Sequence, residues 1–276
     1  MPISPHTCIP QPTLFAVTQL TLRTAALKPW AQTDPLLKAQ ACLALDLNLP
    51  VGACDEVLAP QNGPGRAAKP VLVPHTQLKA KSMATPEGRA MLVHSIAHIE
   101  LNAIDLALDV VWRFAGMPEA FYTDWVRIAQ EEAKHFGLLR QHLVEMGFDY
   151  GDFPAHNTLW DMAERTQDDL LARIGIVPRT LEARGLDASP GVKNKLVSVG
   201  DHRAGEILDI ILADEIGHVA AGNRWYRHLC AQRGLDPIST YAQLVAHYDA
   251  PKLRPPFNLA ARRLAGFEET ELDALN

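Results

Sequence analysis

Hydrophobic and polar positions repeat with a helical period through most of the chain after residue 87. Cap residues, prolines and glycines divide this part into four long helices, which we expect at about 87–114, 118–146, 158–186 and 201–233. Pro178 predicts a kink in the third helix, and Ser189-Pro190-Gly191 predicts an interruption after it. No segment in this part alternates with the two-residue period of a strand. The pattern therefore predicts an all-α fold, a bundle of four long helices.

The regions on either side of these helices have a different pattern. The segment 1–30 predicts a strand or a short helix, and Asp34-Pro35 marks the start of a further helix. Residues 48–86 are rich in proline and glycine, so we expect an ordered arm there, and a short helix is expected near 259–264. We expect both regions to pack on the bundle, with a separate N-terminal domain as the alternative. The predicted segments are an N-terminal extension over 1–86, the bundle over 87–233 and a C-terminal tail over 234–276.

Composition narrows the class of protein. The chain has 276 residues, 47% hydrophobic and 21% charged, which is enough to bury a globular core. Acidic residues interrupt the apolar runs before the ~20 residues of a membrane span, and the N-terminus lacks the apolar core of a signal peptide. We therefore expect a cytoplasmic protein without a membrane partner.

The net charge of −6 and the lack of a basic stripe give no strong nucleic-acid signal. The four cysteines are irregularly spaced, and we expect isolated reduced thiols.

Two of the predicted helices carry the same short motif. The second contains Glu131-Glu132 followed by His135, and the fourth contains Asp214-Glu215 followed by His218. A glutamate and a histidine three residues apart lie on one helix face, one turn apart, so both side chains can reach one metal ion. A single motif of this kind is common on helix surfaces and indicates little by itself.

A lone glutamate precedes each motif at nearly the same distance along the chain. Glu100 precedes Glu132 in the first half, and Glu182 precedes Glu215 in the second. The offset between the halves is almost constant for the lone glutamates, the motif glutamates and the motif histidines, which is typical of a duplicated helical hairpin. Two glutamates and two Glu-x-x-His motifs, one from each of four helices, are the ligand set of a di-iron or di-manganese carboxylate site.

Helix geometry supports Glu100, Glu132 and Glu215 as metal ligands more strongly than it supports Glu182. Glu100 and Glu132 lie equally far along the chain from the turn near residue 116, so both have the same height in an antiparallel pair. Apolar residues share the helix faces of Glu100, Glu132 and Glu215, where cations would offset the cost of burying charge. Glu182 matches the height of Glu215 only if its helix continues beyond Ser189. Its rival Glu206 lies half a turn out of phase with Glu215.

The acidic residues beside the motifs suggest supporting roles. A histidine that ligates a metal usually donates its other ring N–H to a carboxylate. We expect Asp214 to hold His135 and Glu131 to hold His218, and Asp105 and Arg184 are weaker candidates for the same kind of support. His94 and His98 lie far round the helix from Glu100, so we interpret both as structural or surface residues.

Four stretches carry a resemblance to a known family. They are HSIAHIELNAIDLALD at 94–109, AQEEAKHF at 129–136, RTLEARGLD at 179–187 and LADEIGHVAAGNRWY at 212–226. The chain resembles the ferritin-like di-iron carboxylate superfamily, most closely a bacterial ferritin-like family known as a domain of unknown function. It is also similar to tRNA isopentenyl-adenosine hydroxylases, which pair Glu-Ala-Arg on the third helix with a later Glu-x-x-His at the spacing seen here between Glu182 and Glu215.

The resemblance implies a ferritin-like fold, a ligand set and a reaction class. It implies that two iron ions are ligated by the two motifs and the lone glutamates, with manganese as the alternative metal: Glu100, Glu132, His135, Glu182, Glu215 and His218. We expect an O₂-dependent di-iron oxidoreductase of the hydroxylase or monooxygenase type, acting on a small molecule or an RNA base, with an electron-donor protein. The alternatives are a ferroxidase or metal-handling protein, a di-manganese enzyme that disproportionates peroxide, and a metal-free helical scaffold.

Overall fold

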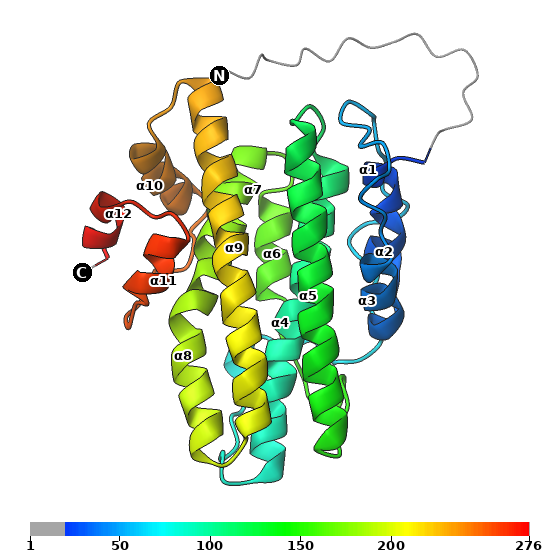
Figure 1. The fold of residues 1–276 in the computed structure, drawn as a ribbon, viewed down its shortest axis with the longest axis vertical. Coiled ribbons are helices and arrows are strands. Elements are labelled where there is room, and N and C mark those ends of the chain that lie inside the picture. Colours follow the sequence, from blue (N-terminus) through cyan, green and yellow to red (C-terminus); the bar gives the residue numbers. More distant parts are fainter. Residues whose placement is uncertain (1–19, 276) are drawn as a thin grey trace. The chain divides into compact units, whose positions relative to one another are not determined.

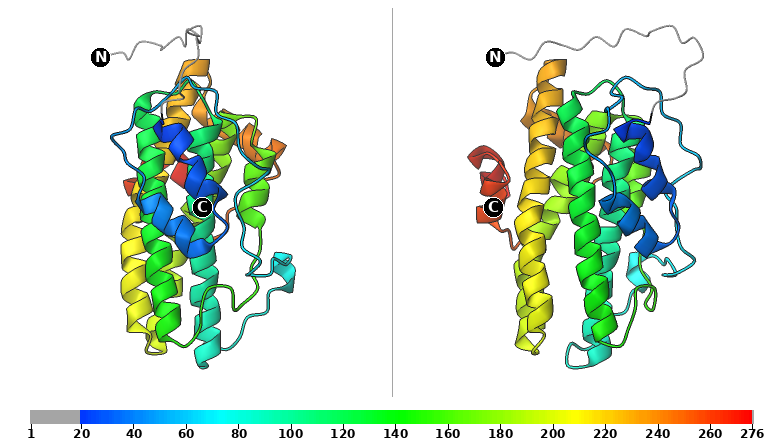
Figure 2. Two further views of the ribbon diagram at one scale, coloured as in Figure 1. Left: turned by 90° about the vertical axis from the view of Figure 1, so that its right-hand side faces the viewer. Right: turned by 45° about the vertical axis from the view of Figure 1, so that its right-hand side comes forward.

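The computed structural model describes residues 20–275, and within them the fold is all-α, as predicted (Figure 1). The four longest helices of the described residues are α4 (Pro86–Arg113), α5 (Glu119–Glu145), α8 (Ala183–Ser198) and α9 (His202–Arg233). The shorter helices are α1 (Leu22–Ala25), α2 (Leu27–Ala31), α3 (Pro35–Leu43), α6 (Thr158–Arg165), α7 (Leu170–Ile176), α10 (Pro237–His247), α11 (Leu259–Leu264) and α12 (Glu269–Asp273). A 3₁₀ turn, η1 (His75–Gln77), and a π-helical turn, η2 (Val177–Glu182), complete the list. These long packed helices are consistent with a helical bundle (Figure 2).

α4, α5 and α9 begin and end within one residue of their predicted bounds. The side chain of Thr85 accepts a hydrogen bond from Gly88 N–H at the start of α4, and Asp201 accepts one from Ala204 N–H at the start of α9. α9 ends at Gly234, whose positive φ of 64° suits a residue without a Cβ atom. The strand or short helix expected within 1–30 lies partly outside the described residues, and the described part contains α1 and α2.

Two compact units make up the chain, and each combines segments that are distant in sequence. One contains Met1–Ala68 and Glu100–Gly137, and the other contains Lys69–Ile99 and Leu138–Asn276. Part of the N-terminal extension and parts of α4 and α5 thus fold together in the first unit. The division into extension, bundle and tail stays a prediction.

Within the first unit, the extension is tied to α4 by two buried cations. Arg23 donates from Nε to the carbonyl of Val111 at 3.1 Å and from Nη2 to that of Trp112 at 2.8 Å. These are carbonyls of the last helical turn, which have no partner within their own helix and which a cation satisfies well. Lys38 of α3 forms a buried ion pair with Asp105 and also donates to the carbonyl of Trp30 at 3.1 Å. The extension is therefore part of this unit's core.

In the second unit, the third long helix differs from its prediction. The interruption expected at Ser189-Pro190-Gly191 is absent, because α8 continues through Pro190 to Ser198. Pro190 has no N–H for the carbonyl of Leu186, and the side chain of Asn258 donates to that carbonyl instead, at 3.2 Å. The helix is broken earlier, at residues 166–169, where Asp169 caps α7 by accepting from Leu171 N–H.

Pro178, where the sequence predicts a kink, lies in a π-helical turn. A proline cannot donate the backbone hydrogen bond of a regular helix, and wider turns accommodate it. The hydroxyl of Thr180 donates to the carbonyl of Gly175 at 2.8 Å and so satisfies an acceptor in the widened turn. Glu182 is the last residue of η2, so the sequence places this predicted ligand in irregular helix, where π turns often mark functional sites.

Replacing Gly222 by alanine should lower the free energy of unfolding by about 1 kcal/mol, because an added Cβ atom would crowd the rigid ring of Pro178. That atom would lie 3.1 Å from Cβ and 3.3 Å from Cγ of Pro178. Gly217 of the same helix has open space around it, so Gly217→Ala should stabilise by up to about 1 kcal/mol through helix propensity. Urea unfolding of both variants tests this prediction, and an equal gain for both would contradict it.

The cysteines depart from expectation at one position. Cys42 and Cys230 are free and buried, but Cys54 is disulfide-bonded, so the expectation of reduced thiols is wrong for Cys54. Cys8 lies outside the described residues.

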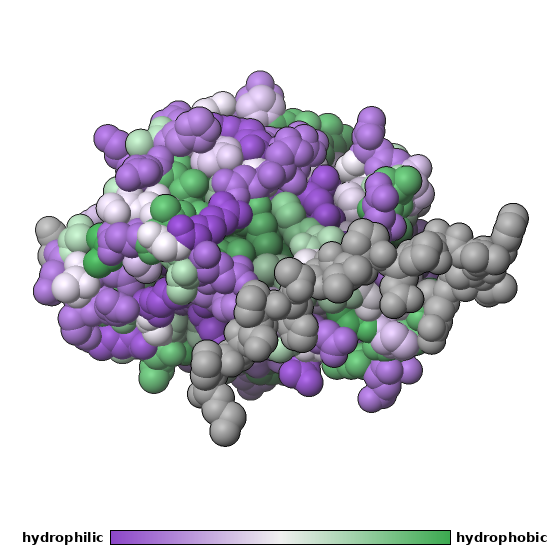
Figure 3. Space-filling model, turned by 90° about the horizontal axis from the view of Figure 1, so that it is seen from above, coloured by the Kyte–Doolittle hydropathy of each residue, from purple (hydrophilic) through white to green (hydrophobic). Residues whose placement is uncertain are grey.

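By length and composition alone, α4 is apolar enough to cross a membrane, and 72% of its apolar window is buried inside the protein. A buried core helix passes the same test, so this is weak evidence for a span. On the surface seen in Figure 3, polar residues surround several apolar groups. Exposed apolar side chains such as Leu58 and Leu264 are normal when they occur singly.

Candidate metal centre

A buried cluster of two carboxylates and an imidazole occupies the first unit. α4 supplies Glu100, and α5 supplies Glu132 and His135 one turn apart. Nδ1 of His135 lies 3.1 Å from Oε2 of Glu100 and 3.5 Å from Oε2 of Glu132. All three residues are at most 3% exposed, and each offers a ligand atom within 4.8 Å of the others. The cluster could therefore hold a metal ion.

The helices bury this cluster because apolar side chains share its faces. Ala103 and Ile104 stand three and four residues after Glu100, and Ile128, Ala129 and Phe136 flank Glu132 in the same way. All five are buried. Burial of carboxylates among such side chains is costly unless positive charge is nearby. The sequence thus positions acidic groups where a cation offsets their charge.

His135 supplies part of that positive charge when no metal is bound. Burial lowers the pKa of His135, but hydrogen bonds to Glu100 and Glu132 outweigh burial and raise the pKa to about 10. The imidazole is therefore protonated at neutral pH, between two carboxylates. Because an imidazole must be neutral to ligate a metal, an ion that binds here takes the place of this proton.

The spacing of these donors fits a bound transition-metal ion. Two ligand atoms that each lie about 2.1 Å from an ion, at angles of about 90–110°, are about 3.0–3.4 Å apart. The separations of 3.1 and 3.5 Å around His135 are close to that range. Carboxylate oxygen and imidazole nitrogen, without thiolate, suit iron, manganese and zinc.

The second unit contains the matching Glu/His couple. On α9, Glu215 and His218 are 8% and 1% exposed, and Nδ1 of His218 lies 3.7 Å from Oε2 of Glu215. Glu182 is half-buried at the end of η2, and its helix does continue past Ser189, as the height argument required. Glu206, the sequence rival of Glu182, is exposed.

The residues predicted to support the ligands occupy different environments. Glu131 and Asp214 are half-buried and Arg184 is exposed. Asp105 is fully buried in its ion pair with Lys38, and its second oxygen lies 4.0 Å from Arg66. The roles assigned to these four residues stay predictions.

Lys38 is a buried charged residue of the first unit that sequence reasoning missed. It shares a buried face of α3 with Ala39 and Cys42. Burial raises the pKa of the Cys42 thiol, and the nearby charges of Asp105 and Glu132 raise it further. Burial opposes the charge on both members of the pair, lowering the pKa of Lys38 and raising that of Asp105. The position of Lys38 on an otherwise apolar face of α3 was the sequence signal that could have indicated a buried ion pair.

His94 and His98 are buried structural residues, so the expected structural role is confirmed and the surface alternative does not apply. Nε2 of His94 accepts a hydrogen bond from Gly151 N–H at 2.9 Å, and its ring stacks on Tyr150. His98 donates from Nε2 to the carbonyl of His156 at 2.9 Å, so its Nδ1 accepts the hydroxyl proton of Tyr150 at 2.7 Å. Both histidines fasten the loop after α5 to α4.

His94 should make the protein sensitive to acid. Burial lowers its pKa to about 4, against 6.5 when exposed, so the unfolded chain binds a proton before the native protein does. Stability should fall as pH drops from 6.5 to 4, with up to about 3 kcal/mol from this residue. Urea unfolding at pH 7 and pH 4.5 should show a smaller loss in His94→Gln than in wild type. The exposed His75 is the control site, and equal losses in wild type and His94→Gln would contradict the prediction.

A family model matches the part of the chain that contains all six predicted ligands. Residues 29–273 match a family model described as "Protein of unknown function (DUF455)". The chain is also similar to an uncharacterized protein of Haemophilus influenzae, with 45% identity over 225 residues that cover 79% of this chain and 78% of that protein. No solved structure matches the chain.

Proposed function

Since the chain belongs to the family described as "Protein of unknown function (DUF455)", whose description states no activity, we propose a function from the buried Glu/His residues. We propose that the protein binds two iron ions and is an O₂-dependent oxidoreductase that hydroxylates or desaturates an organic substrate. The observation that carries this proposal is the buried cluster of Glu100, Glu132 and His135, with ligand atoms at metal-binding separations.

The second metal position in this proposal comes from the duplicated motif. Glu215 and His218 repeat the residue types, the spacing and the burial of Glu132 and His135. Glu182 would be the lone glutamate ligand of the second half of the chain, as Glu100 would be of the first half. Glu132 and Glu215 would each hold iron together with the histidine that follows it in the same helix. Manganese in place of iron is the main alternative, since both prefer this donor set.

Bound iron would supply the reduction of O₂, which amino-acid side chains cannot perform. The chain's own residues would hold the ions and exclude water with the apolar faces around Glu132, and His135 would release its proton when metal binds. Hydroxylation of a C–H bond places one oxygen atom in the product and releases the other as water. It consumes two electrons and two protons, so we expect an electron-donor protein as a partner. The organic substrate would be a small molecule or an RNA base.

Metal analysis of protein purified without added metal tests the proposal. We expect two irons per chain and a visible absorption band that develops when the Fe(II) protein meets O₂. Consumption of O₂ should then depend on an added reductant and, for an oxygenase, should increase with an organic substrate. Iron that is oxidised and accumulates beyond two per chain would indicate a ferroxidase instead. A chain that retains no metal and does not bind Fe(II) anaerobically would overturn the proposal.

A further inference from the structure

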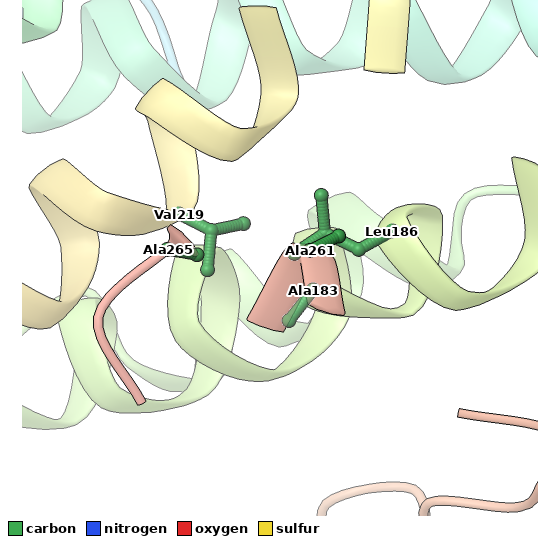
Figure 4. Packing of buried hydrophobic residues seen from close by; sticks show 5 residues of the cluster. All are labelled: Ala183, Leu186, Val219, Ala261 and Ala265. Atoms are coloured by element: carbon green, nitrogen blue, oxygen red, sulfur yellow. The ribbon is translucent and has the colours of Figure 1, made fainter. Parts of the chain in front are cut away.

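The C-terminal helices α11 and α12 pack against the elements of the second unit that carry the predicted ligands. Five buried side chains of α8, α9 and α11 with its C-cap residue form an apolar cluster: Ala183, Leu186, Val219, Ala261 and Ala265 (Figure 4). Two members are chain neighbours of predicted ligands, since Ala183 follows Glu182 and Val219 follows His218. Adjacent residues in a helix point about 100° apart, so α11 contacts the flank of both ligand-bearing turns.

A buried cation connects the π turn to α12. Arg179 lies in η2, three residues before Glu182, and forms an ion pair with Glu271 in which the side chains are 2% and 12% exposed. The same Glu271 accepts a second hydrogen bond from Nη2 of Arg227 on α9, at 3.1 Å. One carboxylate of the tail thus joins the π turn to the helix that carries Glu215 and His218.

Three aromatic rings lie close to the guanidinium group of Arg179. Its guanidinium carbon lies 4.9 Å from the ring centre of Tyr226, 4.3 Å from that of Tyr241 and 5.1 Å from that of Phe267. Cation–π contacts of this kind fix the direction of the side chain but do not neutralise its charge. Glu271 neutralises that charge. If Glu271 is lost, the charge of Arg179 is buried without an ion-pair partner, and the structure must shift to let water reach it.

Two further contacts attach the tail to the same elements. Asp187 of α8 accepts two hydrogen bonds from Arg262 of α11, at 3.0 and 2.6 Å, and Asn223 of α9 donates to the carbonyl of Ala265 at 2.8 Å. α12 has only five residues and is too short to be stable by itself, so these contacts determine where Glu271 lies.

We propose that Glu271 is a positioning residue for the second metal position, because it holds Arg179 and thereby the π turn that places Glu182. This inference rests on the function proposed above. It assigns the C-terminal tail a direct part in shaping the metal centre. Loss of the Glu271 charge would loosen the π turn while leaving the cluster of Glu100, Glu132 and His135 intact.

Anaerobic titration of the metal-free, full-length protein with Fe(II), followed by calorimetry, tests this inference. In Glu271→Gln we expect the first ion to bind as in wild type and the second to bind about 10-fold more weakly, which is the lower end of the effect of losing a group that contacts a ligand directly. Glu271→Asp keeps the charge and should restore part of the affinity. Backbone amides of residues 176–183 should also exchange with deuterium faster in Glu271→Gln than in wild type.

Glu269→Gln is the matched control. Glu269 lies in the same helix and pairs with Arg263 at 2.7 Å, but both of these side chains are more than half exposed. This variant should bind both ions as wild type does. Unchanged binding of both ions by Glu271→Gln would overturn the inference, and so would equal weakening of both ions, which indicates general destabilisation. Failure of the wild-type protein itself to bind two ions would overturn the proposed function, and this inference with it.

Discussion

Replacing Glu132 by glutamine should abolish retention of metal by the purified protein. Glutamine keeps the size of the side chain but removes a negative charge that is fully buried 3.5 Å from His135. Glu132 would be a central ligand of the proposed centre, so metal analysis of the variant should give less than about 0.2 ions per chain. Fe(II) at about 100 times its dissociation constant should stabilise wild type by about 2.7 kcal/mol and leave the variant unchanged.

The metal-free proteins should show the opposite order of stability. Without a cation, Glu132 contributes a buried negative charge that His135 offsets only in part, so the neutral glutamine should be equally or more stable before metal is added. Glu145→Gln, which changes an exposed residue of the same helix, should behave as wild type in both measurements. Two ions per chain in purified Glu132→Gln would exclude Glu132 as a ligand.

Replacing Lys38 by methionine should destabilise the protein by about 3–5 kcal/mol, because it leaves Asp105 as a buried carboxylate without its ion-pair partner. Lys81→Met removes a lysine from an ion pair with Glu87 in which both side chains are about half exposed, and should cost less than about 1 kcal/mol. Urea unfolding of the two variants at pH 8 provides the comparison. Similar losses in both variants would show that the buried pair contributes no more than an exposed one.

The loss in Lys38→Met should also depend on pH. Burial already raises the pKa of Asp105, and removal of the lysine charge should raise it further. A carboxyl group whose pKa is raised in the folded state destabilises that state when it is ionised, and the penalty disappears as the pH falls and the group takes up a proton. The difference between wild type and variant should therefore be smaller at pH 5 than at pH 8. The double variant Lys38→Met with Asp105→Leu should recover most of the stability at both pH values.

Helix boundaries were predictable because they depend on local chemistry. Thr85, Asp201 and Gly234 act through hydrogen bonds or backbone angles within a few residues of themselves, and sequence signals record such effects well. The burial of Glu100 and Glu132 followed from the apolar residues on their own helix faces. The couples Glu132/His135 and Glu215/His218 were predictable because their spacing within one helix fixes their proximity.

The continuation of α8 through Pro190 was not predictable from local chemistry. The carbonyl that proline leaves without a donor is satisfied by Asn258, a residue 72 positions away from Leu186. The pairing of Lys38 with Asp105 likewise joins residues 67 positions apart. Contacts of this range depend on how the units fold, and a single sequence carries no local record of them.

Arg23 limits how far the chain can be shortened. A fragment that begins at residue 87 would lack the guanidinium that binds the carbonyls of Val111 and Trp112, and those carbonyls would lose their donor in an apolar setting. Trp112 would also lose the ring of Trp30, which contacts it edge-on at 5.0 Å. The smallest autonomous piece of this protein is therefore larger than its ligand-bearing helices. Minimised versions for engineering should retain Arg23 and Trp30.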